Sequence, residues 1–70
     1  MRLWIYASVV EHDYQLRQHL LEELRTLQIM PTIHGDDKVE FRYYGERETV
    51  QELGQLCEAH IFHSINIWGG

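Results

Sequence analysis

The sequence lacks the residue patterns that are typical of disulfide-bonded, membrane-spanning and secreted proteins. It has one cysteine, Cys57, which has no partner for a disulfide within the chain. No apolar run reaches the ~18 residues that a transmembrane helix requires, and no charged-then-apolar leader is present. We therefore expect no membrane association, and cytoplasmic residence is the default.

Motifs for nucleotide binding and nucleophilic catalysis are also missing. The sequence contains no P-loop and no glycine pattern for dinucleotide binding. Ser8, Ser64 and Cys57 lack the glycine-rich elbow that presents a nucleophile. The expectation is a protein without enzymatic activity.

Basic residues are scarce. Six Lys and Arg face eleven Asp and Glu, for a formal net charge of −5. This balance repels phosphate backbones and suits a basic partner. Hydrophobic residues make up 44% and there is one proline, which together favour a folded domain over disorder. A chain this short forms a single domain, residues 1–70, of marginal stability, to which association would add.

Hydrophobic periodicity predicts a strand and a helix in the first half of the chain. Leu3–Val10 is uncharged and rich in β-branched and aromatic residues, which is typical of a central strand. Asp13 is a suitable N-cap for a helix that follows. Its apolar stripe at helical spacing consists of Leu16, Leu20, Leu24 and Leu27, widened by Leu21.

The second half predicts two strands, a helix and a last strand. Ile29–His34 contains Pro31 and suits a sheet edge, and Lys38–Tyr44 alternates as a half-exposed strand that Gly45 ends. The helix that follows has Glu46 and Glu48 in its first turn. Its inner stripe is Val50, Leu53, Gly54 and Cys57, continued by His60 and Ile61. The last strand spans about Phe62–Trp68.

The resulting β-α-β-β-α-β order predicts an α+β fold, a ferredoxin-like two-layer sandwich. Right-handed crossovers and a hairpin between the second and third strands give an antiparallel sheet of order 4-1-3-2. A β-grasp fold opens with a hairpin, whereas here a helix follows the first strand. Alternation assigns these residues to the face under the helices: Leu3, Ile5, Ala7, Val9, Ile33, Val39, Phe41, Tyr43, Ile65 and Ile67.

The opposite face of the sheet has no helix over it and carries the leading candidate site. Its partner-binding candidates are Trp4, Tyr6, Arg42, Tyr44, Asn66 and Trp68, with Ser8, Glu40 and Ser64 between them. Aromatic residues and arginine are typical of interface hot spots. The leading hypothesis is a small acidic interaction module, of regulator, adaptor or inhibitor type, that binds a protein partner or a second copy of itself. In the alternative interpretation these side chains merely cover the sheet.

Two activities known for related folds are disfavoured. RNA-recognition domains stack bases on aromatic residues of this same surface. Here the segment Lys38–Tyr44 lacks the glycines of their motif and places Glu40 on the platform, so single-stranded nucleic acid is a less favoured ligand. Acylphosphatases share the predicted fold, but their glycine-rich phosphate-binding loop and its arginine are absent.

A second candidate site lies at one end of the predicted sheet. The topology places His12, His60 and His63 near one another, with Cys57 and Glu11 or Asp13 as further ligands. His34 falls on the opposite edge strand and is excluded. Such a trio suits zinc or copper. In the alternative interpretation Cys57 is a small core residue, His60 complements a helix C-terminus and the other histidines are solvated.

The sequence ends in Gly69-Gly70. A flexible diglycine resembles the tails of ubiquitin-like sulfur carriers, whose terminal carboxylate is activated by adenylation. Those carriers have a β-grasp fold, and a frayed terminus is the alternative explanation.

Overall fold

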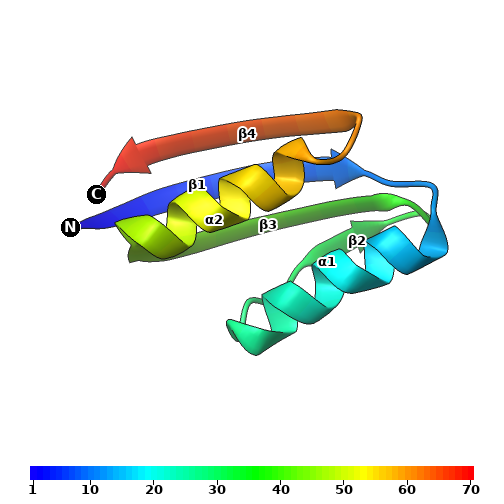
Figure 1. Ribbon diagram of the computed structural model, residues 1–70, viewed down its shortest axis with the longest axis horizontal. Helices are drawn as coiled ribbons and strands as arrows, with labels where there is room; N and C mark the ends of the chain where they lie inside the picture. Colours follow the sequence, from blue (N-terminus) through cyan, green and yellow to red (C-terminus); the bar gives the residue numbers. More distant parts are fainter.

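The computed structural model describes all 70 residues and has the predicted order of elements (Figure 1). The elements are β1 (Arg2–Val10), α1 (Tyr14–Thr26), β2 (Thr32–His34), β3 (Lys38–Glu46), α2 (Arg47–Glu58) and β4 (Phe62–Gly69). The strands form one antiparallel sheet in the order β2-β3-β1-β4, which is the predicted order read from the other edge. The α+β class and the central position of β1 are confirmed. Neither helix is long and apolar enough to cross a membrane.

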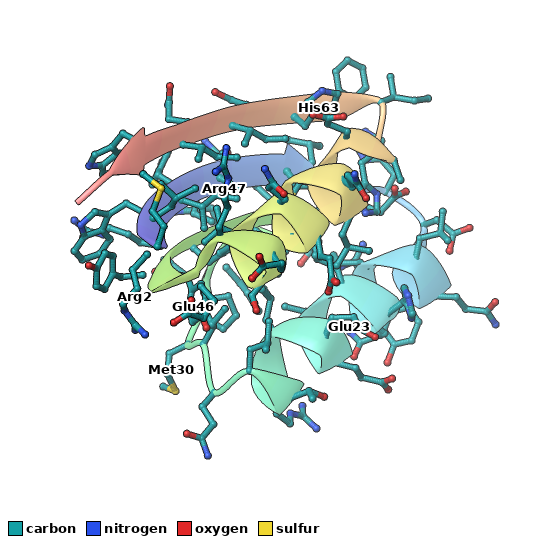
Figure 2. All side chains as sticks on the ribbon, turned by 60° about the vertical axis from the view of Figure 1, so that its left-hand side comes forward. Arg2, Glu23, Met30, Glu46, Arg47 and His63 are labelled. Carbon is teal, nitrogen blue, oxygen red and sulfur yellow. The ribbon has the colours of Figure 1, made fainter.

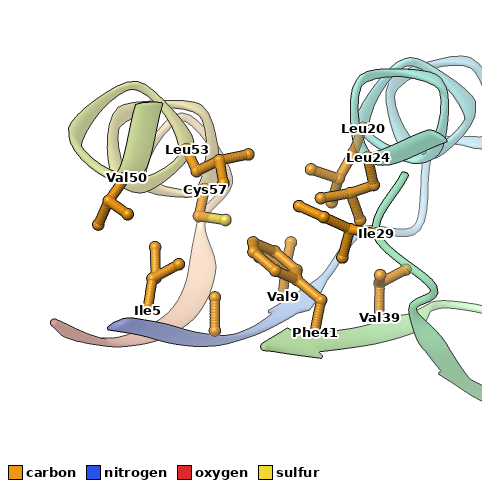
Figure 3. Close-up of a cluster of buried hydrophobic side chains, with 11 residues drawn as sticks. Ile5, Val9, Leu20, Leu24, Ile29, Val39, Phe41, Val50, Leu53 and Cys57 are labelled. Carbon is orange, nitrogen blue, oxygen red and sulfur yellow. The ribbon is translucent and has the colours of Figure 1, made fainter. Parts of the chain in front are cut away.

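The hydrophobic core lies between the sheet and the two helices, which cover the same face (Figure 3). Strand alternation directs every second residue of β1 into it. Burying one leucine or isoleucine side chain contributes about 1.5–3 kcal/mol. The core residues are Ile5, Ala7, Val9, Leu20, Leu24, Ile29, Val39, Phe41, Val50, Leu53 and Cys57.

Helix α1 begins and ends with specific hydrogen bonds. The Asp13 carboxylate accepts from the Leu16 N–H at 3.1 Å, as an N-cap should. At the other end the Gln28 N–H donates to the Arg25 carbonyl and the Ile29 N–H to the Leu24 carbonyl, both at 2.9 Å. This is a Schellman motif, with Gln28 in the left-handed region at φ 60°.

Glycine is the residue that normally occupies this left-handed position, so Gln28→Gly is expected to stabilise the protein. The gain is about 0.5–1 kcal/mol, because the Cβ strain removed exceeds the added entropy of the unfolded chain. It would raise the melting temperature by roughly 4–8 °C per kcal/mol in a domain of this size. Gln28→Ala is the control, since alanine keeps the strain. Equal melting temperatures for the two variants would contradict the assignment.

The boundaries of β2 and β3 differ from the prediction. Strand β2 is limited to Thr32–His34, because Ile29 is committed to the Schellman motif and is buried in the core. Strand β3 continues through Gly45, which lies opposite Leu3. A Cβ at Gly45 would lie 2.4 Å from the Tyr43 ring, so this ring occupies the space of the missing side chain.

Helix α2 follows β3 without a loop. Glu46 stands at its N-cap position instead of in the first turn and forms an ion pair with Arg2 at 3.4 Å, whereas Glu48 lies in the first turn as predicted. The predicted inner stripe is buried from Val50 to Cys57. Within it Gly54 lies against the Ile67 side chain, whose Cδ1 would be 3.4 Å from a Cβ at that position.

Four residues expected in the core are largely exposed. These are Leu16, Ile33, Ile61 and Ile67, with exposed fractions of 52, 52, 87 and 44%. Ile33 and Ile67 belong to the edge strands β2 and β4, where the helices give less cover than over the centre of the sheet. Ile61 lies in the turn after α2, and Leu16 lies in the first turn of α1.

Candidate functional site

The six predicted contact residues lie together on the face of the sheet opposite the helices. In the register, Trp4 stands between Tyr44 on β3 and Trp68 on β4. Tyr6 stands likewise between Arg42 and Asn66. Because residues at alternate positions share a face, both rows lie on the uncovered side. We call this set, Trp4, Tyr6, Arg42, Tyr44, Asn66 and Trp68, the aromatic face.

The rings of the aromatic face form a continuous row across three strands. The Trp4 and Tyr44 centroids are 4.8 Å apart with planes tilted by 37°. The Trp4 and Trp68 centroids are 6.1 Å apart and the planes are within 13° of parallel. Each such pair contributes about 0.5–1.5 kcal/mol beyond area burial, so the row is pre-arranged before any partner binds. Trp68 keeps 45% of its surface exposed.

Arg2 extends this row and was missed in the sequence analysis. Its guanidinium lies 4.8 Å from the centroid of the Tyr44 ring and donates to the Tyr44 carbonyl at 3.3 Å. It is labelled in Figure 2, at the end of the sheet where the two termini lie. The signal was available, since Arg2 is two residues from Trp4 and strand alternation places both on one face. The predicted strand began one residue too late to include it.

Glu40 provides a carboxylate on the same uncovered side of the sheet as the aromatic face. It accepts a hydrogen bond from the Tyr6 hydroxyl, and the Nε2 of His34 lies 2.5 Å from its other oxygen. The hydrogen bond from Tyr6, with the charges of His34 and Lys38 adding to it, lowers the pKa of Glu40. The same bond raises the pKa of Tyr6. His34, which was excluded from the predicted metal trio, thus contacts Glu40 on the uncovered face of the sheet.

A shallow polar hollow of about 350 Å³ adjoins these groups on the open face. Arg42 and Glu40 both line it, together with the exposed Met30. Its lining residues are Tyr6, Met30, Thr32, Glu40, Phe41 and Arg42.

The histidine end is built around one carboxylate. The His60 Nδ1 is hydrogen-bonded to Glu11 Oε1, and the Asp13 N–H donates to Glu11 Oε2 at 2.9 Å. The Glu11 and His60 side chains are 15% and 7% exposed. The hydrogen bond with His60, followed by that from Asp13, lowers the pKa of Glu11. The pair joins the end of β1 to the turn that follows α2.

The three histidines predicted as metal ligands have separate partners. His12 is paired with Asp37 at 2.9 Å, and the Nδ1 of His63 donates to the His60 carbonyl at 2.6 Å. No three His, Cys, Asp or Glu side chains converge on a position where they could hold an ion. Cys57 lies in the core, where burial raises its pKa to about 12 and keeps the thiol neutral. The structure therefore does not gather His12, His60 and His63 into one ligand set.

Of the two glycines at the end of the sequence, Gly70 contacts the aromatic face. Gly69 belongs to β4 and pairs with Leu3, so a frayed terminus does not describe it. A Cβ at Gly70 would lie 2.7 Å from the Trp4 ring and 2.9 Å from that of Tyr44. The backbone of Gly70 therefore lies directly against the two rings.

Comparison of the chain with models of protein families, with curated proteins and with solved structures finds no significant match.

Proposed function

We propose that this protein is a non-enzymatic binding protein that contacts a protein partner through the aromatic face. The observation that carries this proposal is the row of Tyr44, Trp4 and Trp68 on a sheet face that no helix covers. The order of elements is that of a ferredoxin-like sandwich, which leaves this face free. The fold alone names no function, so the proposal depends on the side chains.

The composition of the aromatic face supports a protein ligand. Tyrosine, tryptophan and arginine are the residues most enriched among interface hot spots. Aromatic side chains have few rotatable bonds, so holding them in a complex costs little conformational entropy. The packing of Trp4 against its two neighbours reduces this cost further.

Charge indicates the chemistry of the partner. The chain carries a formal net charge of −5, and the lowered pKa of Glu40 keeps a carboxylate ionised on the aromatic face. Both features favour a partner with a basic contact surface and oppose a phosphate backbone. Arg2 and Arg42, at the margins of the row, suit carboxylates on that partner.

The test is affinity capture with wild-type protein and a Trp4→Ala, Tyr44→Ala double variant. We expect the wild type to retain a partner protein and the double variant to lose it, because truncating two central aromatic anchors typically removes most of the binding energy. Glu23→Ala, on the exposed side of α1 (Figure 2), is the control and should bind as the wild type does. Circular dichroism checks that all three proteins are folded.

Two results would contradict the proposal. One is equal retention of the same partner by the double variant and the wild type. The other is retention of nucleic acid that survives protease treatment and is lost in the double variant, which would assign the aromatic face to base stacking.

A further inference from the structure

We infer that the free edge of β4 is a homodimerisation site, at which two copies pair strand to strand, antiparallel, about a two-fold axis at Asn66. This inference does not depend on the proposed function, because it concerns the edge of the sheet and the backbone groups there. The occupant is a second copy of this chain.

The two edges of the sheet differ in how they are protected. Strand β2 has three residues and is preceded by Pro31, features that block further strand pairing. Strand β4 has eight residues and contains neither a proline nor a charged residue. Figure 1 shows no segment beyond it. A long, uncharged edge strand is a template for pairing with another chain.

The hydrogen-bonding pattern identifies the backbone groups that β4 leaves free. The Glu11 N–H donates to the Asp37 carbonyl and the Arg47 N–H to the Met1 carbonyl, so odd-numbered residues of β1 bond toward β3. Even-numbered residues of β1 therefore bond toward β4, where their partners are also even-numbered. The N–H and C=O groups that point outward from β4 are those of His63, Ile65, Ile67 and Gly69.

These outward-facing residues are symmetric about Asn66. An antiparallel copy with Asn66 opposite Asn66 pairs residue 65 with 67 and residue 63 with 69, each pair occurring twice. Every free backbone group of β4 is then satisfied in this one register, since each facing pair exchanges two hydrogen bonds. The symmetry extends to the sequence, where Ile65-Asn66-Ile67 reads the same in both directions.

The side chains of β4 are complementary in the same register. Ile65 and Ile67 meet across the axis on the helix-covered face, where Ile67 is 44% exposed in the single chain. On the open face the small Ser64 stands opposite the large Trp68. The chain's excess negative charge lies outside β4, so no like charges meet at the contact.

The two-fold axis in this arrangement is perpendicular to the sheet. Two four-stranded sheets become one continuous sheet, with all four helices on one side and both aromatic faces on the other. The dimer would thus present two copies of the Tyr44–Trp4–Trp68 row on a single surface, which increases avidity for a partner with repeated sites.

Site-specific crosslinking tests both the dimer and its register. Residues 66 and 66 face each other at a non-hydrogen-bonded position, where Cα atoms are about 4.5 Å apart, within the range for a disulfide. We expect Asn66→Cys to form a covalent dimer under mild oxidation. Ser64→Cys, on the same strand and face, should form little, because its opposite residue is Trp68. The native Cys57 is buried and its raised pKa keeps it unreactive.

Sedimentation of the wild type over a dilution series gives the independent measurement. A mass that rises toward twice that of one chain, with crosslinking restricted to position 66, supports the inference. A single-chain mass at every concentration, or equal crosslinking at positions 64 and 66, overturns it. The Trp4→Ala, Tyr44→Ala variant should still dimerise, so failure of the dimer and failure of the proposed function are distinguishable.

Discussion

Replacing Glu11 by glutamine is expected to lower the free energy of unfolding by about 1–3 kcal/mol at neutral pH. The two Glu11 oxygens accept from His60 Nδ1 and from the Asp13 N–H. Glutamine is uncharged and has one acceptor oxygen, so it cannot accept from both donors as the Glu11 carboxylate does. His60 is 7% exposed, and water cannot readily replace the lost acceptor there. The melting temperature should fall by roughly 4–8 °C per kcal/mol.

The difference in stability between the wild type and Glu11→Gln depends on pH, in a direction that follows from the Glu11 pKa shift. The folded-state pKa lies below the ordinary value of 4.5, so the unfolded chain binds the proton more readily. The contribution of Glu11 to stability is therefore complete above about pH 4.5 and is lost as the pH falls through the folded-state pKa. The stabilities of wild type and Glu11→Gln should converge in acid. Urea denaturation at a series of pH values measures this convergence.

Glu40→Gln is the matched control for this experiment. Glu40 also has a lowered pKa, but it lies on the open face, where solvent screens its interactions. Its replacement should cost less stability than that of Glu11. A larger loss for Glu40→Gln, or a Glu11→Gln difference that is constant between neutral and acidic pH, would show that the Glu11–His60 pair does not hold the end of the sheet.

Proline is expected to be far more damaging at position 66 than at position 67. The Asn66 N–H points toward β1, so proline there removes a ladder hydrogen bond and leaves the Tyr6 carbonyl unpaired, at about 1–3 kcal/mol beyond the cost of Asn66→Ala. The Ile67 N–H points outward, where an edge strand tolerates proline. Ile67→Pro should therefore remain folded, with a cost close to that of Ile67→Ala.

The same pair of variants separates folding from association. Ile67→Pro removes two of the donors that the proposed dimer uses, one from each copy, and should sediment as a single chain. Thermal unfolding and sedimentation of the proline and alanine variants measure both effects. Equal costs of proline at 66 and 67, or a greater cost at 67, would contradict the assignment of inward and outward groups on β4.

Much of the fold could be predicted because its signals are local and periodic. Alternation in β1 placed Ile5 and Trp4 on opposite faces, and the helical stripes of α1 and α2 contain five of the eleven core residues. The ends of elements were predicted less well. The sequence predicts that Gly45 ends the strand, because glycine is a common strand breaker. In the structure the strand continues, and the Tyr43 ring occupies the space that a side chain at position 45 would take.

The aromatic face was predictable for the same reason, since face membership depends only on alternation and strand order. The histidine end was not. Topology brought His12, His60 and His63 to one end of the sheet, but a ligand set also needs convergent ring directions, which depend on hydrogen bonds in the turns. The Glu11–His60 contact joins residues 49 positions apart, and no local pattern indicates it.

Gly54 lies on the side of α2 that faces Ile67 of the outer strand β4. With only hydrogen at this position, the helix lies against Ile67, where a methyl group would reach ordinary van der Waals distance. A bulkier residue would lift the helix and uncover more of the apolar side chains of β4. An edge with more accessible apolar surface is prone to open-ended stacking of sheets. A small residue at position 54 is thus compatible with α2 lying close to β4 and covering part of the apolar surface of that strand.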